Sequence, residues 1–272
     1  MNFNAPRLAT LLPAIMILIS ACSVNKATID NDLKKYFDEK KAEGCFTMLN
    51  NATGEVTVYN MSLDTAKAFP GNTFNILTAM VALENGIIPN ENTILPFDSI
   101  THLNNPGLND MNVVTAFQRN QPLFFEMLAR KTGSAKMQDW INKVGYGNKR
   151  INKDTTNYWD HTLLISPDEQ LGLLKRMYFN QLPFRQSVQE SVKSMLIKEN
   201  NSAYTLAYQA ANVKTVDGRQ QAWVMGWIEE NKHVYFFVTY AKFSSASADV
   251  NKSTMDLTQR ILGHYGFFKG DK

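Results

Sequence analysis

One stretch in the first third of the chain is apolar on every side of the helix it would form. Residues 73–84 contain no proline or glycine, and their apolar side chains recur at helical spacing on two opposite faces. Pro70 and Gly71 break the preceding segment, Asn72 is a favoured N-cap residue, and Gly86 supplies a stop signal. The pattern predicts a buried core helix that is capped by Asn72.

Segments rich in β-branched and aromatic residues lie on both sides of a long helical region, which runs from residue 73 to about residue 198. The predicted strands are 45–49, 55–59, 204–211, 222–229 and 234–243, and the predicted terminal helices are 29–41 and 253–265. Asn50-Asn51-Ala52-Thr53-Gly54 is typical of a hairpin turn between the first two strands. We therefore predict an α+β fold, in which an antiparallel sheet is built from both terminal regions, flanked by terminal helices, and interrupted by a mostly helical region over about 66–200.

The N-terminal segment has the features of a bacterial lipoprotein signal. It carries one arginine, no acidic residue and an apolar run at 8–19 that is too short to span a bilayer. Ile19-Ser20-Ala21-Cys22 resembles a lipobox, whose cysteine is lipidated; the alternative is an ordinary signal peptide with a chance cysteine. Lipid on Cys22 would hold the protein at a membrane of the cell envelope, facing the periplasm. The predicted organisation is a signal peptide over 1–21, a lipidated tether over 22–30 and a single domain over 31–272.

Net charge and cysteine content argue against several classes of partner and of catalytic residue. The chain has 28 basic residues against 25 acidic ones, and loss of Arg7 with the signal peptide leaves 27 against 25. So small an excess indicates no nucleic-acid partner and no acidic substrate. With Cys22 lipidated, Cys45 has no disulfide partner, and its place in a predicted strand favours a small buried hydrophobe over a catalytic thiol. No metal-binding or dinucleotide motif occurs in the sequence, so we expect no cofactor.

The predicted core helix begins with Pro70-Gly71-Asn72-Thr73-Phe74-Asn75. This segment resembles Pro-x-Ser-Thr-Phe-Lys, the active-site sequence of class D serine β-lactamases and of the wider penicillin-binding, serine-acylating family. The resemblance extends over about 44–265 and includes Tyr146-Gly147-Asn148, which is typical of class D enzymes. Trp159 matches a tryptophan that shields the carboxylated lysine of the family. The chain is identified as a member of this family, which implies the same α+β fold.

The residues that match the three catalytic motifs of the family differ from them in chemistry. The resemblance places Asn72 where the family has its nucleophilic serine and Asn75 where it has its lysine base. Asn120-Gln121-Pro122 matches the Ser-x-Val motif, whose serine relays a proton. Lys-Thr-Gly, which anchors the substrate carboxylate in the family, falls on Gln209-Ala210-Ala211. A carboxamide is neither a usable nucleophile nor a base near neutral pH.

Other residues of the chain offer parts of this chemistry. Lys214-Thr215-Val216 is an alternative position for the third motif, but it lacks the glycine and lies close to the next strand. The one literal Ser-x-x-Lys, which begins at Ser23, lies in the predicted tether. Thr73 should point away from the direction of Asn72, and His161 could border the cleft as a lone histidine. The Ser-x-x-Lys of the tether has no helix, pocket or oxyanion donors, and none of the other residues combines a nucleophile with a base.

These observations predict a catalytically inactive family member, a pseudo-enzyme, because losing the nucleophile or the base alone costs about a millionfold in a comparable hydrolase. Asn72, Asn75, Asn120 and Gln209 would line one cleft, which suits a neutral polar ligand such as a peptidoglycan fragment. One alternative is an active β-lactam-hydrolysing or penicillin-acylated enzyme with a relocated nucleophile. Another is a structural envelope lipoprotein whose cleft is a vestige, with its amides paired to one another.

Overall fold

The computed structural model of the protein describes residues 27–152, 161–215, 219–243 and 249–272. Cys22 and Trp159 lie outside these residues, and so do the predicted signal peptide and most of the predicted tether. Within the described ranges, no helix has the length and apolar character needed to cross a membrane.

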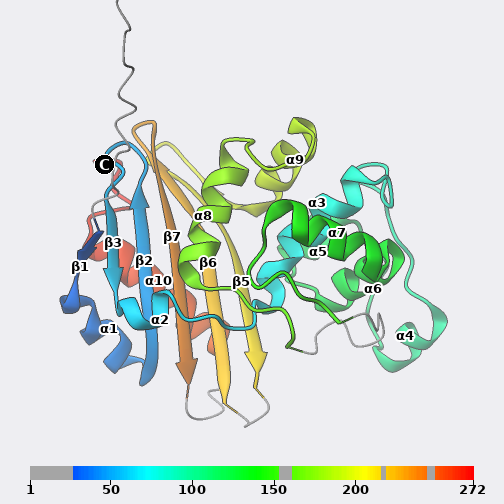
Figure 1. The fold of residues 1–272 in the computed structure, drawn as a ribbon, viewed down its shortest axis with the longest axis horizontal. Coiled ribbons are helices and arrows are strands. Elements are labelled where there is room, and N and C mark those ends of the chain that lie inside the picture. Colours follow the sequence, from blue (N-terminus) through cyan, green and yellow to red (C-terminus); the bar gives the residue numbers. More distant parts are fainter. Residues whose placement is uncertain (1–26, 153–160, 216–218, 244–248) are drawn as a thin grey trace, which may run out of the picture.

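A seven-stranded sheet runs through the centre of the fold (Figure 1). Its strands lie in the order β1-β3-β2-β7-β6-β5-β4, and all neighbours are antiparallel except the pair β1 and β3. The strands are β1 (Ala27–Ile29), β2 (Ala42–Asn50), β3 (Val56–Tyr59), β4 (Ile197–Asn200), β5 (Thr205–Lys214), β6 (Gln220–Glu230) and β7 (His233–Phe243). Because β2 pairs with β7, segments from the two ends of the chain meet in the middle of the sheet, as predicted.

Helices cover both faces of this sheet. The helices are α1 (Lys34–Glu39), α2 (Met61–Asp64), α3 (Asn75–Glu84), α4 (Ser99–Asn104), α5 (Val113–Gln118), α6 (Pro122–Thr132), α7 (Ser134–Val144), α8 (Pro167–Tyr178), α9 (Gln186–Leu196) and α10 (Val250–His264), with 3-10 turns η1 (Asn31–Leu33) and η2 (Gly71–Phe74). α1 and α10 pack on one face, and α8 with the inserted helical region packs on the other (Figure 1). The prediction of an α+β fold with an inserted helical region is confirmed.

Helix α3 lies in the larger of the two cores. Nine of its ten residues are buried, from Asn75 to Leu83, which confirms the prediction of a helix that is buried on every side. The helix ends before Gly86, whose φ of +66° is the left-handed conformation that glycine adopts without strain. Cys45 is also fully buried in this core, and burial raises the pKa of its thiol well above the ordinary value, so it is packed as a hydrophobe.

Two edges of the sheet differ from the prediction. Residues 27–29, placed in the tether and at the start of a helix, instead form β1 and pair in parallel with β3. Residues 197–200, placed at the end of the helical region, form β4 against β5. In both cases a short segment with no buried residue covers an edge strand whose backbone groups would otherwise lack partners. Edge pairing of this kind depends on the neighbouring strand and has little signal in the local sequence.

Candidate functional site

The 3-10 turn η2 brings the start of the core helix against β5. Gly71 has a φ of +53°, and a Cβ atom added to it would lie 2.5 Å from Val213 Cγ2 and 3.4 Å from Ala211 Cβ. Only glycine allows this approach, so the Pro-Gly break in the sequence sets the spacing between η2 and β5. The prediction that Asn72 caps the helix is wrong: Asn72 lies inside η2, and its side chain makes no capping bond.

The side chain of Asn72 instead joins two other amides, which we call the amide cluster: Asn72, Asn120 and Gln209. Gln209 Nε2 donates to Asn120 Oδ1 at 2.8 Å, and Asn72 Nδ2 lies 3.5 Å from the same oxygen. Gln209 Nε2 also donates to the carbonyl of Ala210 at 3.1 Å. Three side chains from η2, the α5–α6 connection and β5 therefore meet at one acceptor.

The backbone around Asn120 presents its side chain to this cluster. Asn120 has a φ of +48°, a left-handed conformation that asparagine tolerates better than most residues. Its N–H donates to the carbonyl of Phe117 at 3.3 Å, and the next residue, Gln121, accepts from Leu123 N as the N-cap of α6. The turn that ends α5 and starts α6 thus positions Asn120.

Other residues assigned to the cleft from the sequence have different environments. Asn75 is fully buried, and neither its Oδ1 nor its Nδ2 has a hydrogen-bond partner among the residues that the structure describes. Ala211 is buried beneath Gly71, while half-buried Ala210 contributes only its carbonyl to Gln209. Lys214 is exposed at the end of β5, opposite Gln220, so Gln209 and not Lys214 faces Asn120.

A buried hydrogen-bonded group beside the cluster has no counterpart in the sequence-based prediction. Gln170 Nε2 donates to Thr73 Oγ1 at 2.8 Å and lies 3.5 Å from Tyr146 Oη, while Thr73 Oγ1 donates to Pro70 O at 2.8 Å. Burial raises the pKa of Tyr146 well above its usual range. The Thr73 hydroxyl is fully buried and engaged on both sides, so it is not available as a nucleophile. The signal that could have found this group is Gln170, a polar residue on the apolar face of α8.

Lys198 is a second residue that the sequence analysis missed. Its Nζ donates to the carbonyl of Phe117 at 3.2 Å, which is the carbonyl that also accepts the N–H of Asn120. The same Nζ lies 5.8 Å from the centre of the Tyr208 ring. Burial lowers the pKa of Lys198 from its ordinary value. No sequence motif marks this lysine, because it reaches the cluster through the pairing of β4 with β5.

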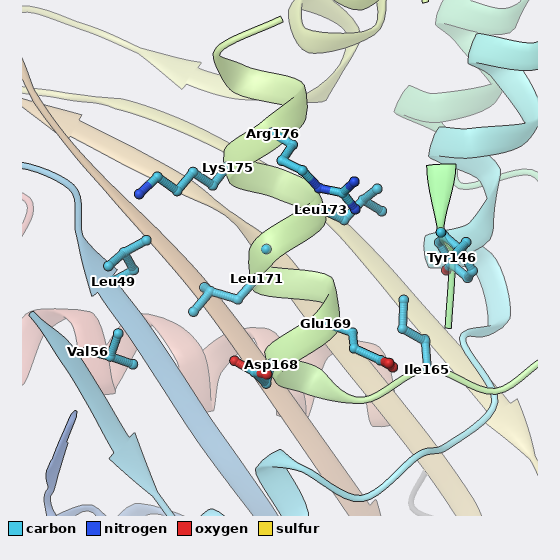
Figure 2. A pocket seen from close by; sticks show the side chains of 12 residues that line it. Leu49, Val56, Tyr146, Ile165, Asp168, Glu169, Leu171, Leu173, Lys175 and Arg176 are labelled. Atoms are coloured by element: carbon cyan, nitrogen blue, oxygen red, sulfur yellow. The ribbon is translucent and has the colours of Figure 1, made fainter. Parts of the chain in front are cut away.

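A cavity of about 340 Å³ lies along α8 and is separate from the amide cluster. Figure 2 shows Leu171 and Lys175 on the side of the helix that faces Leu49, with Arg176 on the opposite side. None of the three cluster residues lines this cavity. Buried Asp64 lies close enough to Asp168, which does line it, for that charge to act together with burial and raise the pKa of Asp64 to about 7.

Comparison with known proteins identifies the family of this chain. Residues 44–262 match the family described as "Penicillin binding protein transpeptidase domain". The chain belongs to this family. Beta-lactamase OXA-20 of Pseudomonas aeruginosa is 27% identical over 90% of this chain and 91% of its own length. Regulatory protein BlaR1 of Bacillus licheniformis is 26% identical over 87% of this chain, which spans only 39% of that relative.

A solved structure agrees with the sequence matches. The crystal structure of the class D beta-lactamase YbXI from Nostoc has a TM-score of 0.78 and 26% identity to this chain, and covers 87% of this chain and 99% of its own. The resemblance to class D serine β-lactamases and penicillin-binding proteins stated from the sequence is thus confirmed, together with the fold.

The prediction that the protein is not an enzyme is contradicted by these comparisons. Relatives of similar length are named β-lactamases, and those names point to a hydrolase. The prediction equated the absence of a side-chain nucleophile and base with the absence of activity. In other hydrolases, however, substrate binding and backbone donors alone keep a rate about 10³- to 10⁴-fold above that in water. The identity of the side chains at the motif positions therefore does not decide by itself whether the protein is an enzyme.

Proposed function

We propose that the protein binds β-lactams, or cell-wall fragments of related acyl-peptide chemistry, at the amide cluster. The observation that carries this proposal is that Asn72 Nδ2 and Gln209 Nε2 both approach Asn120 Oδ1, so that amide side chains from three separate elements meet. Asn72 and Asn120 are half-buried, so a ligand can reach their amides, whereas Gln209 is buried behind them. Carboxamides donate and accept hydrogen bonds, and so complement the amide groups of such a ligand.

A second candidate function is hydrolysis of the bound β-lactam, which is favoured by the names of the relatives. With the Thr73 hydroxyl engaged, the attacking atom would be the oxygen of a water molecule held by the cluster amides. That oxygen would bond to the lactam carbonyl carbon as the carbon–nitrogen bond of the ring breaks, and a proton of the water would pass to the ring nitrogen. The amides would orient this water and take no proton from it.

The proposal is tested with the full chain in detergent, mixed with benzylpenicillin and with a carbapenem. We expect both compounds to raise the melting temperature, and Asn120→Ala to abolish that rise while the unliganded protein stays folded. The matched control is Asn85→Ala, because Asn85 is a half-buried asparagine at the end of α3 that bonds only locally, to Val81 O at 2.7 Å. Absence of any shift with the wild type, or loss of the shift only through unfolding, would contradict binding at the cluster.

Hydrolysis and acylation are separated in the same samples. Loss of the lactam absorbance at a rate above that of buffer, without a change in protein mass, supports attack by water. A stoichiometric mass increase instead shows a covalent adduct, and peptide mapping then identifies the acylated side chain. A rate equal to that of buffer, with no adduct, rules out the second candidate and leaves binding as the function.

We also propose that the protein is held at the bacterial cell envelope by a lipid on Cys22 and faces the periplasm. The lipobox-like Ile19-Ser20-Ala21-Cys22 supports this, and only residues 23–26 separate the cysteine from β1. A chain of that length reaches at most about 18 Å, so the domain would lie close to the membrane surface. Radiolabelled palmitate should be incorporated into the wild type, whereas the Cys22→Ala variant should remain unlabelled and should no longer be found in the membrane fraction. A labelled Cys22→Ala variant would refute this anchor.

A further inference from the structure

Lys198 and Asn120 of the amide cluster donate to the same backbone carbonyl, that of Phe117. Its Nζ is 3.2 Å from Phe117 O, which in turn is 3.3 Å from Asn120 N, so the ammonium lies within 6.5 Å of the Asn120 backbone. The lysine comes from β4, at the point where the register between β4 and β5 shifts between Ile197 and Glu199. An irregularity of this kind re-aims a side chain at the edge of a sheet.

This ammonium has no anionic partner among the residues that the structure describes. The neighbouring carboxylate of Glu199 accepts the hydroxyl of Tyr204 instead. Burial acts alone to lower the pKa of Lys198, with no nearby carboxylate to offset it. An ammonium carries three N–H donors, and its one hydrogen bond to a described residue is that to Phe117. A partly desolvated cation without a counter-ion is costly, and an incoming anion would relieve that cost.

The other lysines of this part of the fold either pair with a carboxylate or are exposed to solvent. Lys193, one helix turn before β4, pairs with Glu190 at 3.0 Å and donates to Tyr178 O at 2.8 Å. Lys214 is exposed at the far end of β5. Lys67 pairs with Glu169 at 2.7 Å. Of these four lysines, Lys198 is the one that combines partial burial, proximity to Asn120 and an ammonium without a carboxylate.

We propose that Lys198 binds a carboxylate on the ligand that the amide cluster holds. This inference rests on the proposed function and refines its ligand class: the cluster takes the amide part of the ligand, and Lys198 takes its anionic part. The neutral polar ligand expected from the sequence is replaced by an amide that carries a carboxylate. Both the ring carboxylate of a penicillin and the C-terminal carboxylate of a cell-wall peptide have this chemistry.

The test compares benzylpenicillin with its methyl ester, which keeps the amides and lacks the negative charge. Dissociation constants are measured by calorimetry on the full chain in detergent. We expect the wild type to bind the acid roughly 10- to 100-fold more tightly than the ester, the range of a hydrogen-bonded charge pair. Lys198→Met should remove this difference without changing ester binding, and Lys198→Arg should keep most of it. Lys193→Met is the matched control and should leave the ratio unchanged.

The outcomes separate this inference from the proposed function. If the wild type binds both compounds and Lys198→Met leaves their ratio unchanged, Lys198 is not the carboxylate site, although the cluster still binds the ligand. If neither these compounds nor a peptide that ends in a free carboxylate binds the wild type, the proposed function fails and the role of Lys198 fails with it. The dissociation constant of that peptide, compared with the constant of benzylpenicillin, shows which of the two sources is bound more tightly, and the C-terminal amide of the peptide shows whether its carboxylate contributes.

Discussion

The two faces of the central sheet differ in how their buried polar side chains are paired. On the face covered by α10, Thr258 Oγ1 lies 2.8 Å from both Thr239 Oγ1 and Thr254 O. It can donate its one hydrogen to the Thr254 carbonyl and accept from the Thr239 hydroxyl, while the Thr254 hydroxyl donates to Val250 O. On the face covered by the helical region, five fully or almost fully buried side chains have at least one polar atom without a partner among the residues that the structure describes. They are Thr47, Asp64, Asn75, Gln170 and Tyr240.

This difference indicates which face is shaped for packing alone. Buried polar atoms in proteins are normally paired, because each unpaired one costs roughly 1–3 kcal/mol. On the α10 face the buried threonines are paired by short local bonds, and Asn251 Oδ1 is the one buried side-chain atom of α10 itself without a partner in the described part of the chain. The other face departs from it at several places. One of them is beside the amide cluster, where Gln170 bonds to Thr73, which follows Asn72 in the chain. Departures of this kind are expected where a site is retained at some cost in stability.

The largest effect is expected from Gly71→Ala, which disturbs the helical-region face where η2 meets β5. The added methyl group would lie 2.5 Å from Val213 Cγ2, and alanine is strained at a φ of +53°. We expect a loss of about 2–4 kcal/mol in the free energy of unfolding, measured by urea denaturation. Gly86→Ala is the control: its φ of +66° gives similar backbone strain without any atom within 4 Å, so its cost should be about 1 kcal/mol. Equal losses would contradict the close contact.

A pH-dependent effect is expected at Asp64. Burial, together with the charge of Asp168, raises its pKa from 3.8 to about 7. The folded state therefore binds a proton more tightly than the unfolded state, so the stability that this group contributes is present below about pH 4 and is lost as the pH rises through 7. Asp64→Asn should reduce the fall in stability between pH 5 and pH 8.5 by roughly 1–3 kcal/mol. Exposed Asp139→Asn is the control, and an unchanged pH profile of Asp64→Asn would refute the assignment.

Asn75→Leu should stabilise the protein. The side chain of Asn75 is fully buried with both amide atoms unpaired, so a leucine removes two unsatisfied groups and adds apolar contact. We expect a gain of about 1–2 kcal/mol in the free energy of unfolding, part of the benefit being offset by the larger volume. A loss of stability would show that the amide is paired in solution, and the contrast between the two faces would then weaken.

The smallest effect is expected from Thr258→Val on the α10 face. Valine keeps the shape of threonine, but Thr239 Oγ1 loses its bonding partner. We expect a loss of about 1 kcal/mol, the opposite sign to Asn75→Leu. Thermal denaturation of both variants in one buffer compares the faces directly, and a gain in stability from Thr258→Val would break the comparison.

Much of the fold was accessible from the sequence because its strongest signals are local. The run after Gly71 is apolar on every side. Strands β6 and β7 are rich in aromatic and β-branched residues, and the turn residues Asn231 and Lys232 join them. Strands β1 and β4 were missed because they are short and have no buried face, and they form only where β3 and β5 present an unpaired edge. The N-cap assigned to Asn72 failed for a similar reason, since its amide finds a partner 48 residues away.

The sequence by itself determined the family, the α+β architecture and the identity of the three amides in the cluster, because these follow from motif order and hydrophobic pattern. Only the tertiary structure decided that Asn120 Oδ1 is their meeting point, that Asn75 is buried apart without a partner, and that Lys198 lies beside the cluster. The physical reason is that hydrogen-bond geometry and desolvation depend on residues brought together across the chain, such as Lys198 and Phe117, 81 positions apart.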